Sequence, residues 1–161
     1  MQVLEQLKQM PAERFLSIYK SLDQKGFGPL DDQVAKSLRF RPQAVRKLPM
    51  ETRARRAKHL LESSGNIELT YELFGAYLMK SCRELVIGFL DATGVQHKDG
   101  LIEDLDSTHP AKDKIDATVK DLDSRFAADD VTLYLALCAE QWSALPELDL
   151  LWRSRTAKVA R

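Results

Sequence analysis

The stretch Leu69–Leu90, LTYELFGAYLMKSCRELVIGFL, is the longest strongly apolar part of this sequence. Charged residues interrupt it at four positions, so no apolar run approaches the ~20 residues that a membrane-spanning helix requires. With its flanks the segment runs from Asn66 to Thr93, which is long for a single helix of a globular protein. We therefore predict a buried helix with a kink or break near Lys80.

A second apolar segment, Val131–Gln141, carries aliphatic and aromatic residues on nearly all sides of a helix, which is typical of a central helix. The segment Pro110–Phe126 instead alternates between apolar and charged residues with helical spacing, which is typical of a surface helix. The sequence thus predicts two buried central helices wrapped by amphipathic ones. The apolar positions of the amphipathic segment are Ile115, Val119, Leu122 and Phe126.

No stretch shows the period-two alternation of a half-buried strand, and the glycines and prolines fall almost entirely between the helical patterns. The chain has 161 residues, of which 44% are hydrophobic and 30% charged, as in a soluble globular protein. We predict an all-α fold: a single compact domain over residues 1–161 with about seven to nine helices. Helices are expected to end at Gly26, Gly65 and Gly94, and to be capped at Asp31 or Asp32 and at Asn66.

The N-terminus, MQVLEQLKQM, lacks the basic start and unbroken apolar core of a signal peptide, so the cytoplasm is the expected compartment. Cys82 and Cys138 lie in apolar, helical surroundings, where cysteine behaves as a small hydrophobe. Apolar residues on several sides of the helices permit a homo-oligomer without requiring one. No membrane association is expected.

The stretch Phe89–Asp106, FLDATGVQHKDGLIEDLD, combines five acidic residues with a histidine and raises the question of a metal site. No register places calcium ligands at the alternate positions of an EF-hand loop. His97, Asp99 and His109 are candidate zinc ligands, although their spacing matches no compact ligand pair. A helix stop followed by an Asp-Gly turn explains the same residues more simply, and we expect no metal or cofactor.

This stretch carries a resemblance to a known group of proteins. Its pattern FLDxxGVxHxxGxI, preceded by Leu78, Arg83 and Leu85, is similar to one shared by a set of uncharacterised bacterial all-helical proteins. The similarity extends into the segment LYLALCAEQW. The resemblance implies a helical fold and a bacterial protein, and it implies no activity.

Charge is distributed unevenly, although the net charge is zero. The segment Lys36–Lys58 holds nine bases and one acid, Glu51, whereas Asp91–Asp130 holds eleven acids and five bases. Such blocks face different partners or face each other.

Within the basic segment, Gln33–Leu48 resembles a DNA-binding helix-turn-helix. Ala35 matches the small residue that faces the partner helix, and Val45 matches the buried aliphatic of the second helix. Two features depart from the motif: Arg39 occupies the turn position where glycine is usual, and Pro49 ends the second helix after about seven residues. The alternative is two short helices with a charged outer face.

We expect the protein to act by binding, with a protein partner at the surface around Arg39–Arg56. The first alternative is nucleic-acid binding through the same segment, with Gln43, Arg46 and Lys47 toward the major groove and arginines on phosphates. The second alternative is a metal-dependent or cysteine hydrolase, and the sequence argues against an enzyme. The predicted binding residues are Arg39, Arg41, Gln43, Arg46, Lys47, Arg53 and Arg56.

Overall fold

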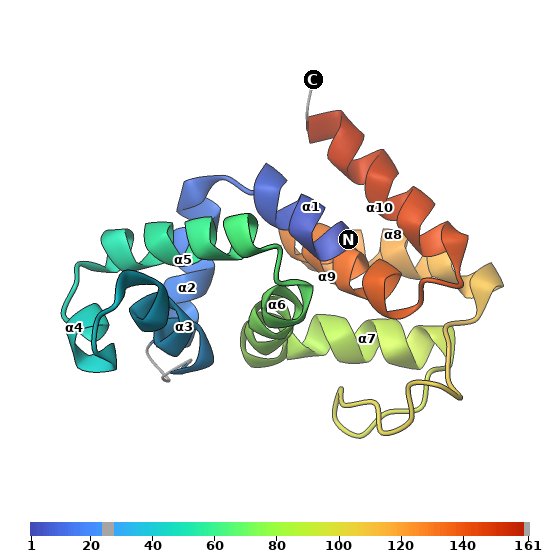
Figure 1. Cartoon of the computed structure of the whole chain (residues 1–161). Coiled ribbons are helices and arrows are strands. Elements are labelled where there is room, and N and C mark those ends of the chain that lie inside the picture. The colour runs from blue at the N-terminus through green and yellow to red at the C-terminus, as the bar shows by residue number, and fades with distance from the viewer. Residues whose placement is uncertain (24–27, 160–161) are drawn as a thin grey trace. The chain divides into compact units, whose positions relative to one another are not determined.

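The computed structural model describes residues 1–23 and 28–159 and confirms the all-α class (Figure 1). These residues form ten α-helices and one 3₁₀ turn, and they contain no strand. The predicted helix stop at Gly26 lies outside the described residues. The helices are α1 (Gln2–Gln9), α2 (Ala12–Asp23), α3 (Gly28–Leu38), α4 (Pro42–Arg46), α5 (Met50–Ser64), α6 (Ile67–Ser81), α7 (Arg83–Thr93), η1 (Lys112–Lys114), α8 (Ile115–Arg125), α9 (Ala128–Gln141) and α10 (Pro146–Val159).

The long apolar segment is broken, as its length predicts. Helix α6 ends at Ser81, and α7 begins at Arg83 after Cys82, whose backbone (φ −133°, ψ 33°) is not helical. Asn66 caps α6 as expected, since its side-chain oxygen accepts a hydrogen bond from the Leu69 N–H at 3.0 Å. The predicted glycines end α5 and α7, both in the left-handed conformation.

Contacts group the chain into two compact units, Val3–Tyr77 with Met1 (unit 1) and Leu78–Arg161 with Gln2 (unit 2), with the main boundary inside α6. The expectation of a single domain stays a prediction. None of the helices that the structure describes is long and apolar enough to traverse a bilayer.

In unit 1, α2 packs against α5, and α3 packs against both α4 and α5. The core side of α5 is an apolar stripe in which Ala54, Ala57 and Leu61 are buried. The two alanines let α2 approach closely, and Phe15 of α2 is buried in the same core. The hydrophobic stripe therefore positions α5 so that its remaining sides carry the charged residues.

A buried polar cluster joins three helices of unit 1. Arg53 Nη2 of α5 lies 3.1 Å from Asp31 Oδ2 of α3, and both side chains are only 5% exposed. The Tyr19 hydroxyl of α2 donates a hydrogen bond to Asp31, and the Arg53 guanidinium lies 5.6 Å from the Tyr19 ring centroid. The predicted cap at Asp31 or Asp32 is wrong, because both residues lie within α3 and Asp31 is used for this pair.

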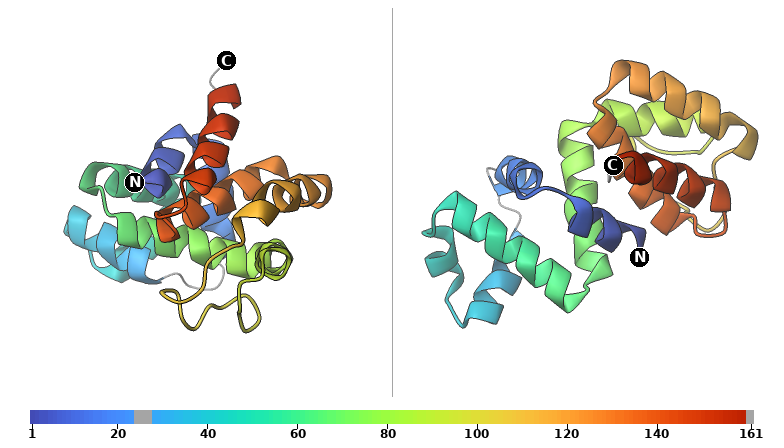
Figure 2. Two further views of the ribbon diagram at one scale, coloured as in Figure 1. Left: turned by 90° about the vertical axis from the view of Figure 1, so that its right-hand side faces the viewer. Right: turned by 90° about the horizontal axis from the view of Figure 1, so that it is seen from above.

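In unit 2, α9 is the central helix, as its composition predicts. Eight of its residues are buried, and it packs against α8 and α10 (Figure 2). The ring of Phe89 in α7 meets Tyr134 of α9 edge-on, with centroids 5.3 Å apart. Trp152 of α10 is fully buried. The amphipathic prediction for α8 is confirmed at Ile115, Val119 and Leu122, whereas Phe126 is half-buried and ends the helix.

Candidate binding surface

The turn between α3 and α4 is closed by Arg39, which has a left-handed backbone with φ +56°. The Phe40 N–H donates to the Ala35 carbonyl at 2.8 Å, and the Arg39 N–H donates to the Lys36 carbonyl at 3.3 Å. These two bonds form a Schellman motif, in which glycine usually takes the left-handed position. Arg39 therefore departs from the helix-turn-helix in residue type but adopts the backbone conformation that the turn requires.

Helix α4 is shorter than predicted. It spans only the five residues Pro42–Arg46, about 7.5 Å of helix. Lys47 and Leu48 form a turn instead, because Pro49 follows and the Leu48 N–H bonds back to the Val45 carbonyl at 3.0 Å. Ala35 and Val45 are buried, as the motif predicts.

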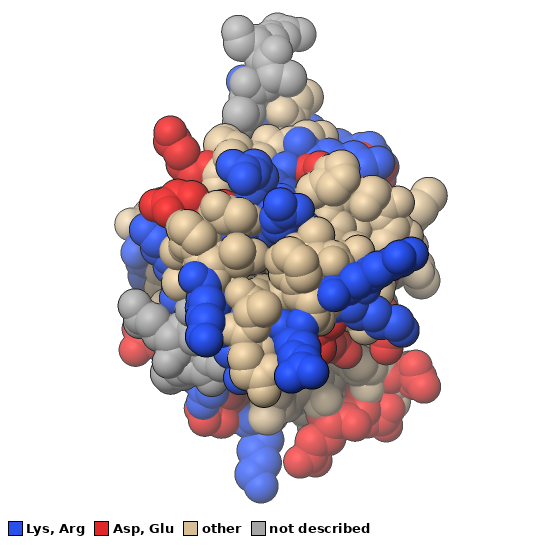
Figure 3. Space-filling view, turned by 60° about the vertical axis from the view of Figure 1, so that its left-hand side comes forward, with Lys and Arg blue, Asp and Glu red and all other residues tan. Residues whose placement is uncertain are grey.

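This turn and its flanking helices carry exposed bases that we call the basic surface. None of these residues forms an ion pair with any side chain in the described ranges 1–23 and 28–159. Figure 3 shows Lys and Arg side chains spread around an uncharged area on the near face of unit 1. Phe40, between two arginines, is 48% exposed. The basic surface consists of Lys36, Arg39, Arg41, Arg46, Lys47, Arg55 and Arg56.

Of the seven residues predicted for binding, all but one are exposed. Arg39, Arg41, Gln43, Arg46, Lys47 and Arg56 lie at the surface on the α3–α4 turn, on α4 and just after it, and on α5. The prediction for Arg53 is wrong, because its guanidinium is buried against Asp31 and Tyr19 and cannot reach a partner. Lys58, also in the basic segment, pairs with Glu62 one turn further along α5.

The arginines of unit 2 are bound differently. Each arginine in its described part, residues 78–159, forms an ion pair with an aspartate of the same unit, three of which lie in the acidic segment Asp91–Asp130. The pair at Arg155 is bidentate, with both bonds to Asp123 at 2.7 Å. The pairs are Arg83–Asp99, Arg125–Asp121, Arg153–Asp149 and Arg155–Asp123.

The histidine bend is a structural turn, as the simpler interpretation predicts. Asp99 and Gly100 both have positive φ, 54° and 91°, and Lys98 and Leu101 exchange two backbone hydrogen bonds across them, as in a type I′ hairpin. The Gly100 N–H donates to His97 Nδ1 at 2.9 Å, so His97 carries its proton on Nε2, which lies 2.6 Å from Asp91 Oδ1.

The candidate metal ligands are engaged elsewhere. His97 holds Asp91, Asp99 pairs with Arg83 at 2.7 Å, and His109 Nδ1 lies 3.4 Å from the Pro110 carbonyl. In the part of the chain that the structure describes, no three His, Cys, Asp or Glu side chains lie together as metal ligands would. The structure therefore does not bring the predicted ligands into one coordination site.

The two cysteines lie in different surroundings. Cys138 is buried in α9, and burial raises the pKa of its thiol to about 12, so the thiol stays protonated at neutral pH. Cys82 lies at the break between α6 and α7 and is in no disulfide.

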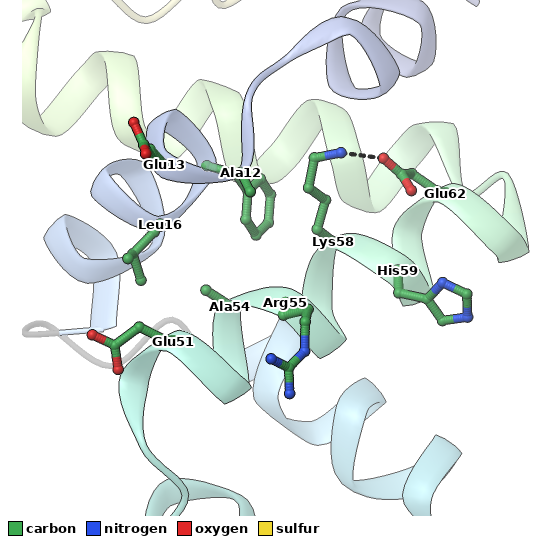
Figure 4. Close-up of a pocket in the computed structure, with 10 residues that line it drawn as sticks. Ala12, Glu13, Leu16, Glu51, Ala54, Arg55, Lys58, His59 and Glu62 are labelled. Carbon is green, nitrogen blue, oxygen red and sulfur yellow. Dashed lines mark hydrogen bonds and ion pairs between the residues drawn. The ribbon is translucent and has the colours of Figure 1, made fainter.

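A groove between α2 and α5 has a volume of about 450 Å³ and was not predicted from the sequence (Figure 4). Its lining includes the buried Phe15 and Ala54, and the small side chain of Ala54 is the only sequence feature that hints at it. Its rim mixes acids with bases, including the Lys58–Glu62 pair drawn in the figure. Because the rim carries both signs of charge, it favours neither an anionic nor a cationic ligand. The groove is a recess beside Arg55 to which we assign no ligand.

No protein-family model matches this chain, and no curated protein or solved structure matches it at a significant level. The expected kinship with uncharacterised bacterial helical proteins stays a prediction.

Proposed function

We propose that this protein binds an acidic protein partner through the basic surface. The observation that supports this function is the group of five exposed arginines, none of which is ion-paired with a described residue. In the same chain, all the described arginines of unit 2 hold an aspartate. The basic surface thus presents guanidinium groups whose bidentate bonding capacity remains available for carboxylates.

The composition of the surface favours a protein over other polyanions. Protein interfaces are enriched in arginine and aromatic residues and depleted in lysine. Five of the seven bases are arginines, and the half-exposed Phe40 stands between two of them in the α3–α4 turn. An aromatic ring among arginines offers a partner an apolar anchor with charged contacts around it.

Duplex DNA is the second candidate, and one observation favours it. Arg39 adopts the left-handed turn of a helix-turn-helix, and Gln43 and Arg46 are exposed on α4, where a recognition helix presents its base-reading residues. The five-residue length of α4 argues against this candidate, because little of such a helix can follow the major groove.

Fluorescence anisotropy distinguishes the two candidates. The probes are a labelled peptide built of repeated Glu-Glu-Leu units and a labelled short duplex DNA, each at about 50 mM and about 200 mM salt. We expect saturable binding of the peptide at both salt concentrations and only weak, strongly salt-dependent binding of the duplex. Tighter binding of the duplex than of the peptide would favour the nucleic-acid candidate.

The variant that tests the surface is Arg46→Ala with Arg56→Ala, because both side chains are exposed and Arg53→Ala would damage the core. We expect about tenfold weaker peptide binding, the equivalent of ~1.4 kcal/mol. Arg83→Ala with Arg125→Ala is the matched control, since it removes the same charge from unit 2 and should leave the affinity unchanged. Equal losses in both variants would contradict the proposal, because they would show a response to net charge alone.

A further inference from the structure

A loop of unit 2 has the chemistry that complements the basic surface. Residues 101–108, between α7 and η1, extend away from the helices of unit 2 (Figures 1 and 2). Three acids of this loop, Glu103, Asp104 and Asp106, are exposed and form no ion pair with any residue in the described ranges. Two leucines between and beside them are also exposed: Leu101 is 62% exposed and Leu105 49%. We call residues 101–108 the acidic loop.

The acidic loop is held in shape before any partner arrives. The Ser107 N–H donates to Asp104 Oδ1 at 3.3 Å, and hydrogen bonds from the Ser107 side chain and backbone lower the pKa of the Asp104 carboxyl. The Trp142 indole N–H donates to the Thr108 carbonyl at 3.0 Å and fastens the end of the loop to α9. A pre-shaped loop loses less conformational entropy when it binds.

The apolar residues of the two surfaces also correspond. Five large hydrophobic residues are exposed in the part of the chain that the structure describes. Three of them lie in these two places: Phe40 among the bases and both leucines among the acids. The acidic loop presents carboxylates around two leucines, and the basic surface presents guanidinium groups around Phe40. The two surfaces are therefore opposite in charge, and each has an apolar centre.

We infer that the partner bound by the basic surface is the acidic loop of a second copy of this chain. The inference rests on the proposed function and names its occupant. Because two different surfaces meet, a single contact is head-to-tail and leaves the acidic loop of one copy and the basic surface of the other free to bind further copies. Charge attraction of this kind weakens as salt increases.

Sedimentation equilibrium of the full chain tests the inference. We expect the average mass to rise above the monomer with increasing concentration at about 50 mM salt, and to fall toward the monomer at about 500 mM. A wild-type chain that stays monomeric at every concentration at low salt overturns the inference. Peptide binding that still depends on Arg46 and Arg56 would then leave the proposed function standing, so the two failures are distinguishable.

Two charge-reversed variants test which surfaces meet. The surface variant is Arg46→Glu with Arg56→Glu, and the loop variant is Glu103→Lys with Asp106→Lys. Each alone should raise the dissociation constant at least about tenfold, because like charges would face each other. Association that either variant retains at the wild-type strength overturns the inference. Lys114→Glu with Lys120→Glu, at exposed positions of η1 and α8, matches the surface variant in net charge and should associate like the wild type.

Mixing the variants gives the decisive result. For this mixture the substitutions are neutral, Arg46→Ala with Arg56→Ala in one variant and Glu103→Gln with Asp106→Asn in the other. Each variant keeps one intact side of the contact, so an equimolar mixture should form heterodimers and stop at that size. A contact between two identical surfaces cannot be restored in this way. A mixture that remains monomeric overturns the inference, provided that circular dichroism shows both variants folded.

Discussion

The arginines of the two units differ in whether they form ion pairs within the chain. In unit 2 each described arginine is paired with an aspartate of the same unit, twice at the i, i+4 spacing of one helix. In unit 1, Arg53 is paired and buried, whereas the five arginines of the basic surface have no acidic partner among the described residues. Like charges within about 10 Å repel one another, so the basic surface destabilises unit 1 until an acidic partner neutralises it. The comparison teaches that the described arginines of unit 2 all serve the fold, whereas unit 1 keeps five exposed arginines available for binding.

The largest difference is expected for Arg53, an arginine of unit 1 that is buried and ion-paired. Replacing it with alanine leaves Asp31 buried without its cation, and such losses cost about 3–5 kcal/mol. We expect Arg53→Ala to lower the free energy of unfolding in urea, followed by far-ultraviolet circular dichroism, by at least ~3 kcal/mol. Arg46→Ala serves as its control and should leave the curve in place. If Arg53→Ala unfolded at the same urea concentration as the wild type, the buried Arg53–Asp31 pair would not contribute to the stability of unit 1.

An intermediate effect of opposite sign is expected at Arg39. Its φ of +56° is strained for any residue with a side chain, and glycine relieves that strain by about 1 kcal/mol. We expect Arg39→Gly to melt at a higher temperature than Arg39→Ala, although both variants lose the same charge and should bind the acidic peptide equally weakly. A lower melting temperature for Arg39→Gly than for Arg39→Ala would contradict the left-handed backbone of residue 39 between α3 and α4.

The smallest effect compares one exposed arginine from each unit. Arg125→Ala removes an exposed i, i+4 pair with Asp121, worth about 0.3–0.5 kcal/mol, so a slight loss of stability is expected. Arg56→Ala removes only repulsion and should be neutral or slightly stabilising. Thermal melts at low salt should resolve this difference, and high salt should shrink it. A larger loss at Arg56 than at Arg125 would break the contrast between the units.

Local patterns in the sequence predict the helices well, because a helix depends on residues within one or two turns. The break in the apolar segment falls at Cys82, two residues from the predicted position, and Asn66 caps α6. The all-round apolar composition of α9 likewise identifies the centre of unit 2.

The candidate site could be predicted only in part. Charge counts locate the basic segment, but they cannot separate Arg53 from its neighbours, since its partner Asp31 lies 22 residues away on another helix. One local signal was available: Arg53, Ala57 and Leu61 follow each other at i, i+4, i+8, which places Arg53 on the core side of α5. Spacing alone also misleads, because Glu51 and Arg55 stand at i, i+4 and form no ion pair, whereas Lys58 and Glu62 do.

The position of the tryptophans has an optical consequence. Both indoles, Trp142 and Trp152, belong to unit 2, so intrinsic emission excited near 295 nm reports on that half of the chain. Because the N–H of Trp142 is tied to the Thr108 carbonyl, anything that settles on the neighbouring leucines and carboxylates should shift this emission without an added dye. Unit 1 contains no indole and does not contribute to this emission. A change in the spectrum therefore reports binding or unfolding at unit 2 alone.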